Sequence, residues 1–287
     1  MARRLRRGDR MVAIAHRLFR EPHRVIPLGT FTEALGAAKS TISEDIAALR
    51  LTCEQFNLGR IETLAGAAGG VRYTPWSTPA QTLTLAEDLA KRLRDPSRIL
   101  PGGFLYTADL LSMPGPVSRL GEVFATFFAD RRPDVVLAME VKGIPLAFMT
   151  ARAFNVPLVT ARRGGMGTEG PSVGVNYVSG SSRTVQSMTL PLRAVSPGAR
   201  ALFIDDFLRG GGTARGVQDL MREFQAEVVG IGVLIETTHP REKLIDRYVS
   251  LLVFDGVDEA KREIRLSPSA WAHAVPEKLG VGGAGFE

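Results

Sequence analysis

Residues 201–216, ALFIDDFLRGGGTARG, join an apolar strand to a loop with two carboxylates and three consecutive glycines. The apolar run ends at Asp205 and Asp206, and Gly210–Gly212 precede Thr213 and a helix-like segment. Successive backbone N–H groups and the positive end of the helix dipole can then converge on one anion. The glycines let this anion approach closely, and the Thr213 hydroxyl adds a donor. The stretch therefore predicts an anion site between a strand and a helix.

The loop matches neither of the common nucleotide-binding motifs. It lacks the GK[ST] ending of a Walker loop and the GxGxxG spacing of a dinucleotide fold. Two carboxylates beside a phosphate repel a ligand unless they accept hydrogen bonds from its hydroxyls. Taken singly, an Asp pair can be a cap or a metal site, and a glycine run can be a flexible turn. Their combination after a buried strand favours a ribose whose 5′-phosphate lies in the glycine loop.

Apolar runs alternate with helix-like stretches over the last three quarters of the chain. The strand-like runs include DVVLAM, VPLVTA, ALFID and VVGIGVLIE. Continuous apolar strands separated by helices predict an α/β fold with a parallel sheet flanked by helices. Ligands bind outside the carboxyl ends of such strands, where we expect the loops EVKGIP and DDFLRGGGT.

Positive charge is concentrated near the N-terminus. The 287 residues include 36 Lys and Arg and 30 Asp and Glu, a net charge of +6. The first 73 residues contain 12 basic and 7 acidic residues, or +5, and the remaining 24 basic and 23 acidic residues contribute +1. A basic segment on a nearly neutral globule is typical of contact with a polyanion such as DNA. A solvated basic tail would have the same charge.

The same segment has the pattern of a helix-turn-helix unit. Apolar residues recur at three- and four-residue spacings in Arg10–Phe19, which predicts an amphipathic helix. A short helix through Leu35, a turn at Gly36 and a helix beginning with KSTISEDIAALR follow. Because the start of the second helix of such a unit faces the major groove, we expect DNA contacts there. The residues concerned are Lys39, Ser40, Thr41 and Ser43.

Two further groups of basic residues are candidates for the DNA backbone. Ile61–Leu64 and Val71–Tyr73 predict a β-hairpin wing, which Arg60 and Arg72 flank. A basic arm precedes the first helix, and its residues are Arg3, Arg4, Arg6 and Arg7. An ordinary three-helix packing module fits the helical pattern equally well, so the clustered charge carries the DNA-binding interpretation.

The segment TPWSTPAQTL is the expected boundary between a winged-helix domain, residues 1–74, and an effector domain, residues 75–287. The single cysteine, Cys53, excludes an internal disulfide. No apolar run approaches the roughly 20 residues that span a bilayer. We therefore expect a cytoplasmic protein with no membrane partner.

The motif LFIDDFLRGGGT resembles the phosphoribosyl pyrophosphate (PRPP) binding motif of type I phosphoribosyltransferases. Four further stretches, AMEVKGIPLAF, VNYVSGSS, STISEDI and GAAGGVRY, resemble the purine operon repressor of Gram-positive bacteria, over essentially the whole chain. That family joins a winged helix to a domain with the type I phosphoribosyltransferase fold. The resemblance implies that PRPP is the ligand of the glycine loop.

The resemblance also implies a role for each part of the site. Asp205 and Asp206 would hold the ribose hydroxyls, residues 209–213 the 5′-phosphate, and the loop around Lys142 the pyrophosphate. Arg162, Arg163 and Tyr177 belong to a Gly- and Ser-rich region that would close over the ligand. The expected PRPP-binding residues are Val141, Lys142, Gly143, Arg162, Tyr177, Asp205, Asp206, Phe207, Leu208, Arg209, Gly210, Gly211, Gly212 and Thr213.

No cofactor is expected to be obligatory, and no residue is assigned to a metal. Mg²⁺ can bridge phosphate and ribose oxygens while it keeps several waters. A ligand with adjacent phosphates, such as guanosine tetraphosphate, can compete for the same loop. A homodimer is expected because two winged helices multiply the phosphate contacts with double-stranded DNA.

Two functions compete at this point. One is a repressor of purine biosynthesis genes, with PRPP weakening its DNA binding; the other is an active purine phosphoribosyltransferase of the xanthine or adenine type. A transferase needs a hood that holds the base and excludes water. The C-terminal segment offers Trp271 and Phe286 but ends in a glycine-rich tail, and no hood is identified. Arg209 and Gly210 stand where transferases often carry small hydroxyl or alanine residues. We therefore predict a regulator, with no catalytic residue assigned.

Overall fold

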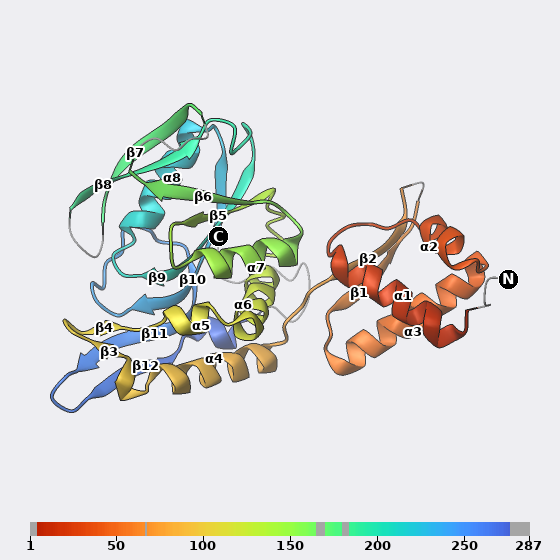
Figure 1. The fold of residues 1–287 in the computed structure, drawn as a ribbon, viewed down its shortest axis with the longest axis horizontal. Coiled ribbons are helices and arrows are strands. Elements are labelled where there is room, and N and C mark those ends of the chain that lie inside the picture. The colour runs from red at the N-terminus through yellow and green to blue at the C-terminus, as the bar shows by residue number, and fades with distance from the viewer. Residues whose placement is uncertain (1–4, 67, 165–169, 180–183, 276–287) are drawn as a thin grey trace. The chain divides into compact units, whose positions relative to one another are not determined.

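The sheet at the centre of the larger part of the chain has eight strands. A computed structural model describes residues 5–66, 68–164, 170–179 and 184–275. Within these residues the strand order is β12-β11-β10-β9-β5-β6-β8-β7 (Figure 1). The pairs among β5, β6, β9, β10 and β11 are parallel, and β12, β8 and β7 join antiparallel. The strands are β5 (Val135–Met139), β6 (Leu158–Arg163), β7 (Ser172–Val178), β8 (Val185–Pro191), β9 (Arg200–Leu208), β10 (Glu227–Thr237), β11 (Val249–Asp258) and β12 (Glu263–Pro268).

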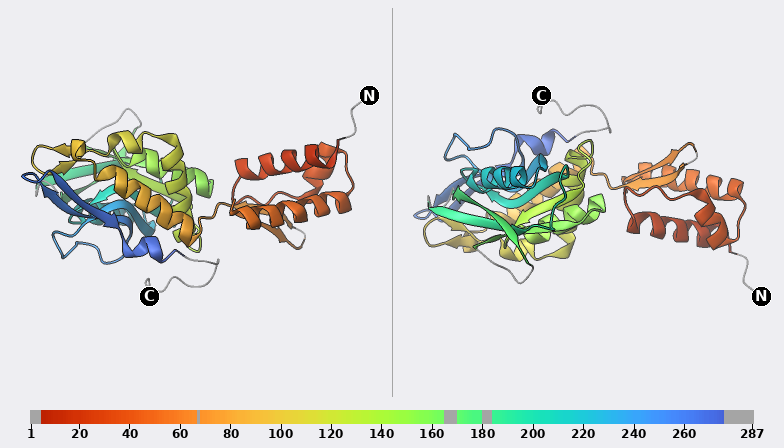
Figure 2. Two further views of the ribbon diagram at one scale, coloured as in Figure 1. Left: turned by 90° about the horizontal axis from the view of Figure 1, so that it is seen from below. Right: turned by 90° about the horizontal axis from the view of Figure 1, so that it is seen from above.

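Helices cover both faces of this sheet (Figure 2). On one face α8 (Gly212–Glu223) packs Val217 and Leu220 against the apolar side chains of the central strands. On the other face α6 (Pro114–Phe127) lies so close that a Cβ at Gly232 of β10 would come within 2.8 Å of Phe124. The α/β fold expected from the alternating apolar runs is therefore confirmed. The remaining elements are α4 (Pro79–Leu93), η1 (Pro96–Arg98), β3 (Ile99–Leu100), β4 (Phe104–Leu105), α5 (Ala108–Leu111), α7 (Ile144–Phe154) and α9 (Ala270–His273).

The N-terminal part folds around a core of its own. Its elements are α1 (Arg7–Arg20), α2 (Leu28–Leu35), α3 (Lys39–Phe56), β1 (Arg60–Leu64) and β2 (Gly70–Thr74). Ile14 and Leu18 of α1 pack with Ile42 and Ile46 of α3, and all four are buried. Gly36 ends α2 with a φ of 58°, the left-handed conformation that a glycine adopts at low cost. The expected helix, turn, helix and wing are present.

The contacts divide the chain into two compact units with a boundary between Ser77 and Thr78, within the segment TPWSTPAQTL. Thr78 caps α4, because its hydroxyl accepts a hydrogen bond from the Gln81 N–H at 3.2 Å and Pro79 occupies the first turn. Among the described residues, none of the helices has the length and apolar character needed to cross a membrane.

Candidate functional site

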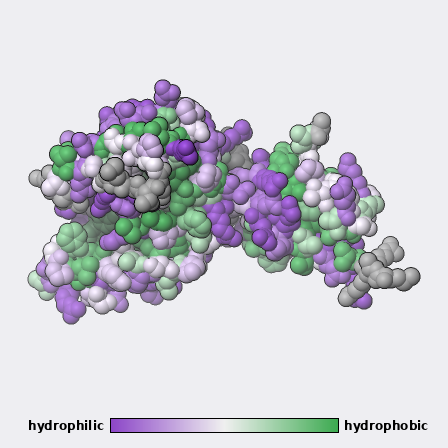
Figure 3. Space-filling model, turned by 45° about the horizontal axis from the view of Figure 1, so that its top comes forward, coloured by the Kyte–Doolittle hydropathy of each residue, from purple (hydrophilic) through white to green (hydrophobic). Residues whose placement is uncertain are grey.

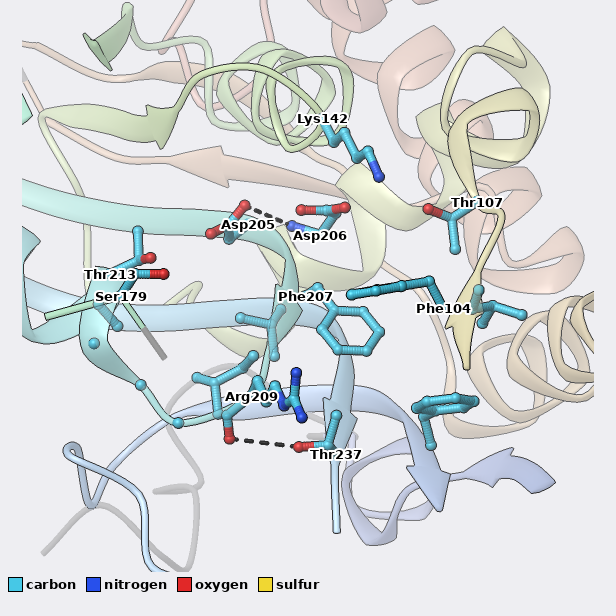
Figure 4. Close-up of a pocket in the computed structure, with 18 of the residues that line it drawn as sticks. Phe104, Thr107, Lys142, Ser179, Asp205, Asp206, Phe207, Arg209, Thr213 and Thr237 are labelled. Atoms are coloured by element: carbon cyan, nitrogen blue, oxygen red, sulfur yellow. Dashed lines mark hydrogen bonds between the residues drawn. The ribbon is translucent and has the colours of Figure 1, made fainter. Parts of the chain in front are cut away.

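A cavity of about 630 Å³ opens at the carboxyl ends of β5, β9 and β10 (Figure 4). This is the edge of the sheet at which parallel α/β folds bind ligands. Residues 139–142, 205–214 and 237–239, at or just after the ends of these strands, line the cavity. Residues 102–105 of the β3–β4 hairpin line it as well. The two loops that were expected to carry the ligand therefore face one cavity.

The acidic pair stands at the end of β9, on the cavity wall. The Asp206 N–H donates a hydrogen bond to Asp205 Oδ1 at 2.9 Å. Burial, and then the neighbouring charge of Asp206, raise the pKa of Asp205 well above its ordinary value. Lys142 extends into the cavity on the same side as the two carboxyl groups (Figure 4). The arrangement favours a ligand that brings hydroxyl donors to the pair and negative charge to the lysine.

The glycine loop presents backbone donors to the same cavity. Gly210, Gly211 and Gly212 are buried, and Gly211 takes a φ of 80° at the N-cap of α8. In the described part of the chain, no backbone acceptor receives the N–H of Gly211, Gly212 or Thr213. Such a group of convergent donors at a helix N-terminus suits a phosphate.

Glycine is required in the loop around Lys142 for a different reason. Gly143 does not line the cavity but packs behind the acidic pair, and a Cβ there would lie 2.7 Å from Asp205 Oδ1. Val141 and Lys142 line the cavity beside it. The absence of a side chain at Gly143 therefore lets the loop approach the end of β9.

Besides Gly143, two expected ligand contacts, Tyr177 and Arg162, do not line the cavity. Tyr177 is 6% exposed, packs under α8 against Gly216, and donates its hydroxyl hydrogen bond to Gln186. Arg162 does not line the cavity, whereas Arg163 does, because neighbouring residues on β6 point to opposite sides. The predicted contacts at Tyr177 and Arg162 are corrected accordingly. Much of the expected flap, residues 165–169 and 180–183, lies outside the described residues.

The structure supplies an aromatic wall of which the sequence predicted only Phe207. Phe104 of β4, Phe207 of β9 and Phe254 of β11 line the cavity, with the last two ring centroids 6.1 Å apart. The Arg209 side chain lies on the same side as Phe207 (Figure 4). Residues 102–107, which we call the hood, therefore cover the cavity on the side of Phe104. Its only sequence signal is GGFLY, in which aromatic residues follow two glycines.

The hood hairpin is held in place by one ion pair. Arg98 forms two hydrogen bonds with the Asp109 carboxylate, at 2.7 and 2.8 Å, and also donates to the Tyr106 carbonyl. Such bidentate pairs are geometrically specific. The Arg98–Asp109 pair thus ties the base of the hairpin to α5.

The start of α3 has the exposure that DNA contact requires. Lys39, Ser40 and Ser43 are exposed, and Thr41 is half-buried. Asp45 is buried instead and forms ion pairs with Arg10 at 2.7 Å and with Arg7 at 3.3 Å on α1. The Asp45 carboxylate is therefore turned towards α1 rather than towards solvent.

The flanking arginines are largely engaged within the N-terminal part. The Arg60 guanidinium lies 3.4 Å from the centroid of the Trp76 ring, a cation–π contact. Arg72 pairs with Glu62 across the wing at 2.7 Å. Arg7, as above, pairs with Asp45, so these three side chains brace the fold. Arg6 precedes α1 and is exposed, whereas Arg3 and Arg4 lie outside the described residues.

Hydrophilic and apolar regions alternate on the visible surface of both parts (Figure 3). On the N-terminal part the exposed apolar side chains include Val12, Leu51, Phe56 and Leu58. The surface of this part is thus not uniformly cationic, and the exposed polar start of α3 is its best candidate for base contacts.

Comparison with known families divides the chain in the same way. Residues 6–75 match the family described as bacterial purine repressor, N-terminal, and residues 118–260 match the phosphoribosyl transferase domain. A xanthine phosphoribosyltransferase of Exiguobacterium is 33% identical over 56% of this chain and 86% of its own. The adenine phosphoribosyltransferase of Saccharomyces cerevisiae, solved with adenine, shares the fold over 58% of this chain and 97% of its own, with a TM-score of 0.51 and 18% identity.

Two relatives match over nearly the full length. The purine biosynthesis transcriptional repressor PurR of Bacillus subtilis is 43% identical over 261 residues, which are 91% of this chain and 92% of that protein. The purine biosynthesis transcriptional activator PurR of Lactococcus lactis is 38% identical over 91% of this chain and 96% of that protein. The chain therefore belongs to the bacterial purine repressor family, whose members regulate the transcription of purine biosynthesis genes.

Proposed function

We propose that this regulator binds control regions of purine biosynthesis genes through α3 and the wing, and that PRPP in the cavity weakens this binding. The observation that supports the ligand best is the meeting of the acidic pair, Asp205 and Asp206, with the donors of residues 210–213 in one cavity. The carboxylates suit the ribose hydroxyls, and the backbone N–H groups suit the 5′-phosphate. Lys142 and Arg163 supply positive charge for the pyrophosphate.

Mg²⁺ fits this donor set as a ligand-borne ion. Within the described residues there is no cluster of three or more His, Cys, Asp or Glu side chains that could hold a metal. Mg²⁺ binds hard oxygens and keeps several waters. The carboxylates of Asp205 and Asp206 would be its protein contacts, and its charge would offset the repulsion between them and the diphosphate.

The aromatic wall supports a second ligand for the same cavity. Phe104, Phe207 and Phe254 are apolar surfaces against which a purine ring can stack, and PRPP has no base to occupy them. Guanosine tetraphosphate carries both a base and adjacent phosphates. We propose that it competes with PRPP at the glycine loop and therefore opposes the effect of PRPP on DNA binding.

The mechanism is a coupling between two sites. If PRPP binds a state of a homodimer that binds DNA poorly, it lowers DNA affinity by the same factor by which DNA lowers PRPP affinity. Couplings of this kind are typically 1–3 kcal/mol, which corresponds to roughly 5- to 150-fold. A dimer suits paired half-sites, where one winged helix offers few phosphate contacts.

Fluorescence anisotropy of a labelled purine-gene promoter fragment tests this proposal. The full-length protein is titrated with and without PRPP and Mg²⁺, and we expect PRPP to weaken DNA binding within the range above. Asp205→Ala with Asp206→Ala should abolish the PRPP effect and leave DNA affinity intact. DNA binding that is insensitive to PRPP in the wild-type protein would refute PRPP as the effector. Steady formation of a nucleotide from PRPP and a purine base would favour a transferase instead.

A further inference from the structure

The segment that follows β10 runs along the back of the glycine loop. We call residues 238–248, between β10 and β11, the strap. The Leu244 N–H of the strap donates a hydrogen bond to the Gly210 carbonyl at 2.9 Å. The Lys243 ammonium lies 2.5 Å from the Arg209 carbonyl oxygen and 2.8 Å from the Thr237 carbonyl oxygen. Two strap residues therefore hold two successive carbonyls of the loop.

An anion-binding loop must direct its N–H groups towards the ligand and its carbonyl oxygens away from it. Here three consecutive carbonyls have donors outside the cavity. The Arg209 carbonyl accepts from Lys243, and the Gly210 carbonyl accepts from the Leu244 N–H. The Gly211 carbonyl accepts from the Arg215 N–H of α8 at 2.9 Å. The N–H groups of the same loop meet no backbone acceptor among the described residues and face the cavity instead. The strap thus contributes to the orientation of the loop.

Side-chain packing reinforces this contact. A Cβ at Gly211, whose φ is 80°, would lie 3.2 Å from both Ile245 Cγ1 and the Leu244 nitrogen. Ile245 is 4% exposed and belongs to the core beneath α8. The strap is therefore fixed in the core at Ile245 and packs against the glycine loop. A substitution at Lys243 should therefore alter the position of the loop.

The three N–H donors of Lys243 are matched by protein acceptors. Besides the two carbonyls, the ammonium lies 3.3 Å from Thr237 Oγ1. The side chain is half-buried, and Glu236, the nearest compensating acid, is itself held by the Tyr248 and Ser250 hydroxyls at 2.5 and 2.6 Å. An ammonium with three protein acceptors has no donor left for a ligand. Its geometry is that of a support for the loop rather than of a phosphate contact.

We propose that Lys243 is a positioning residue for phosphate binding, which holds the Arg209 carbonyl away from the cavity so that the N–H groups of residues 210–213 converge on a 5′-phosphate. This inference rests on the proposed function, because it concerns the same ligand. It differs from the roles of Lys142 and Arg163, which line the cavity.

The test compares two fragments of the ligand. Isothermal titration calorimetry of the full-length protein is carried out with ribose 5-phosphate and, separately, with inorganic pyrophosphate, each with Mg²⁺. Lys243→Met removes the donors and keeps the length of the side chain. We expect it to lower ribose 5-phosphate affinity by roughly 10-fold, the effect of a lost charged hydrogen bond, and pyrophosphate affinity by less than about twofold.

Lys261→Met is the matched control, because it makes the same charge change in the same part of the chain and Lys261 has, among the described residues, an ion pair with nearby Asp258 alone. It should alter neither affinity. Lys243→Arg retains a charged donor but changes its geometry. If the methionine variant fails to fold, the arginine variant tests the proposal against the wild type: it should lose more affinity for ribose 5-phosphate than for pyrophosphate, and an equal loss for both would overturn the positioning role. Circular dichroism establishes that each variant is folded at the assay temperature.

Wild-type affinity for ribose 5-phosphate in folded Lys243→Met would overturn the positioning role. An equal loss for both fragments would also overturn it, since a long-range charge effect acts on pyrophosphate as well. If the wild-type protein binds neither fragment, the proposed function fails instead, so the two failures are distinguishable.

Discussion

Gly143→Ala is the substitution whose effect on the ligand site follows most directly from the structure. The new methyl carbon would lie 2.7 Å from Asp205 Oδ1, 3.1 Å from Asp205 Cα and 3.3 Å from the Asp206 nitrogen. The nearest of these distances is about 0.5 Å shorter than a comfortable contact, and two of the three atoms belong to the backbone of β9, which cannot yield easily. Overpacking of this kind typically costs about 1–3 kcal/mol of stability.

The effect on the ligand should exceed the effect on folding. Relief of the clash moves either the Asp205 carboxylate, which also accepts the Asp206 N–H, or the loop that carries Lys142. Loss of one hydrogen bond to a charged group is worth about 1.5–3 kcal/mol, so we expect PRPP affinity to fall roughly 10- to 150-fold. DNA affinity without PRPP should not change, because the N-terminal part has its own core.

Calorimetric titration with PRPP and Mg²⁺ measures this prediction, with urea unfolding of the same samples as the measure of stability. Gly115→Ala is the matched control: it lies in α6 with no atom within 4 Å of a new Cβ, and it should bind PRPP normally and be as stable as the wild type or slightly more so. If Gly143→Ala binds PRPP as tightly as Gly115→Ala, the acidic pair does not hold the ligand in the way we describe.

Three further predictions follow from single contacts. Asp205→Asn should raise the melting temperature of the unliganded protein at pH 8 and much less near pH 4. The pKa of Asp205 is raised in the folded protein, so its contribution to stability falls as the pH rises above the pKa of the unfolded state, about 3.9. Calorimetric scans with no gain at pH 8 would contradict this. Asp45→Ala removes the buried carboxylate that pairs with Arg10 of α1 and should destabilise the N-terminal part by about 3 kcal/mol in urea, with PRPP binding retained. Lys39→Ala should reduce the slope of log DNA affinity against log salt by about 0.9, whereas Arg72→Ala, already paired with Glu62, should leave the slope unchanged.

Strong local patterns made much of the fold predictable. The strand β5 and residues 201–204 of β9 are buried, so their apolar runs have no polar interruptions that would hide them. The helices around Gly36 carry regular apolar spacing and a glycine that ends α2. In these segments local preference and tertiary packing agree, which is the condition under which sequence patterns are reliable.

The parts that were missed depend on the direction of a side chain or on contacts between distant segments. Tyr177 looked like a ligand contact because it lies among glycines and serines, but the alternation of β7 turns it under α8. The hood could not be recognised, because β3 and β4 have two residues each and show no periodicity. The strap could not be recognised for another reason. Its effect on the glycine loop depends on a contact between residues 34 positions apart.

A regulator and an enzyme make different use of the same cavity. A transferase gains rate only from contacts that strengthen in the transition state, whereas a regulator needs only a difference in ligand affinity between two states. The carboxyl groups of Asp205 and Asp206 repel each other when both are ionised, so a ligand that supplies hydroxyl donors and a cation relieves a cost that the empty site bears. Either state of the protein can gain this reduction in repulsion by closing around the ligand. The gain therefore does not decide whether the ligand increases or decreases transcription. Relatives named repressor and activator each match this chain over 91% of its length, so the cavity alone does not fix the direction of regulation.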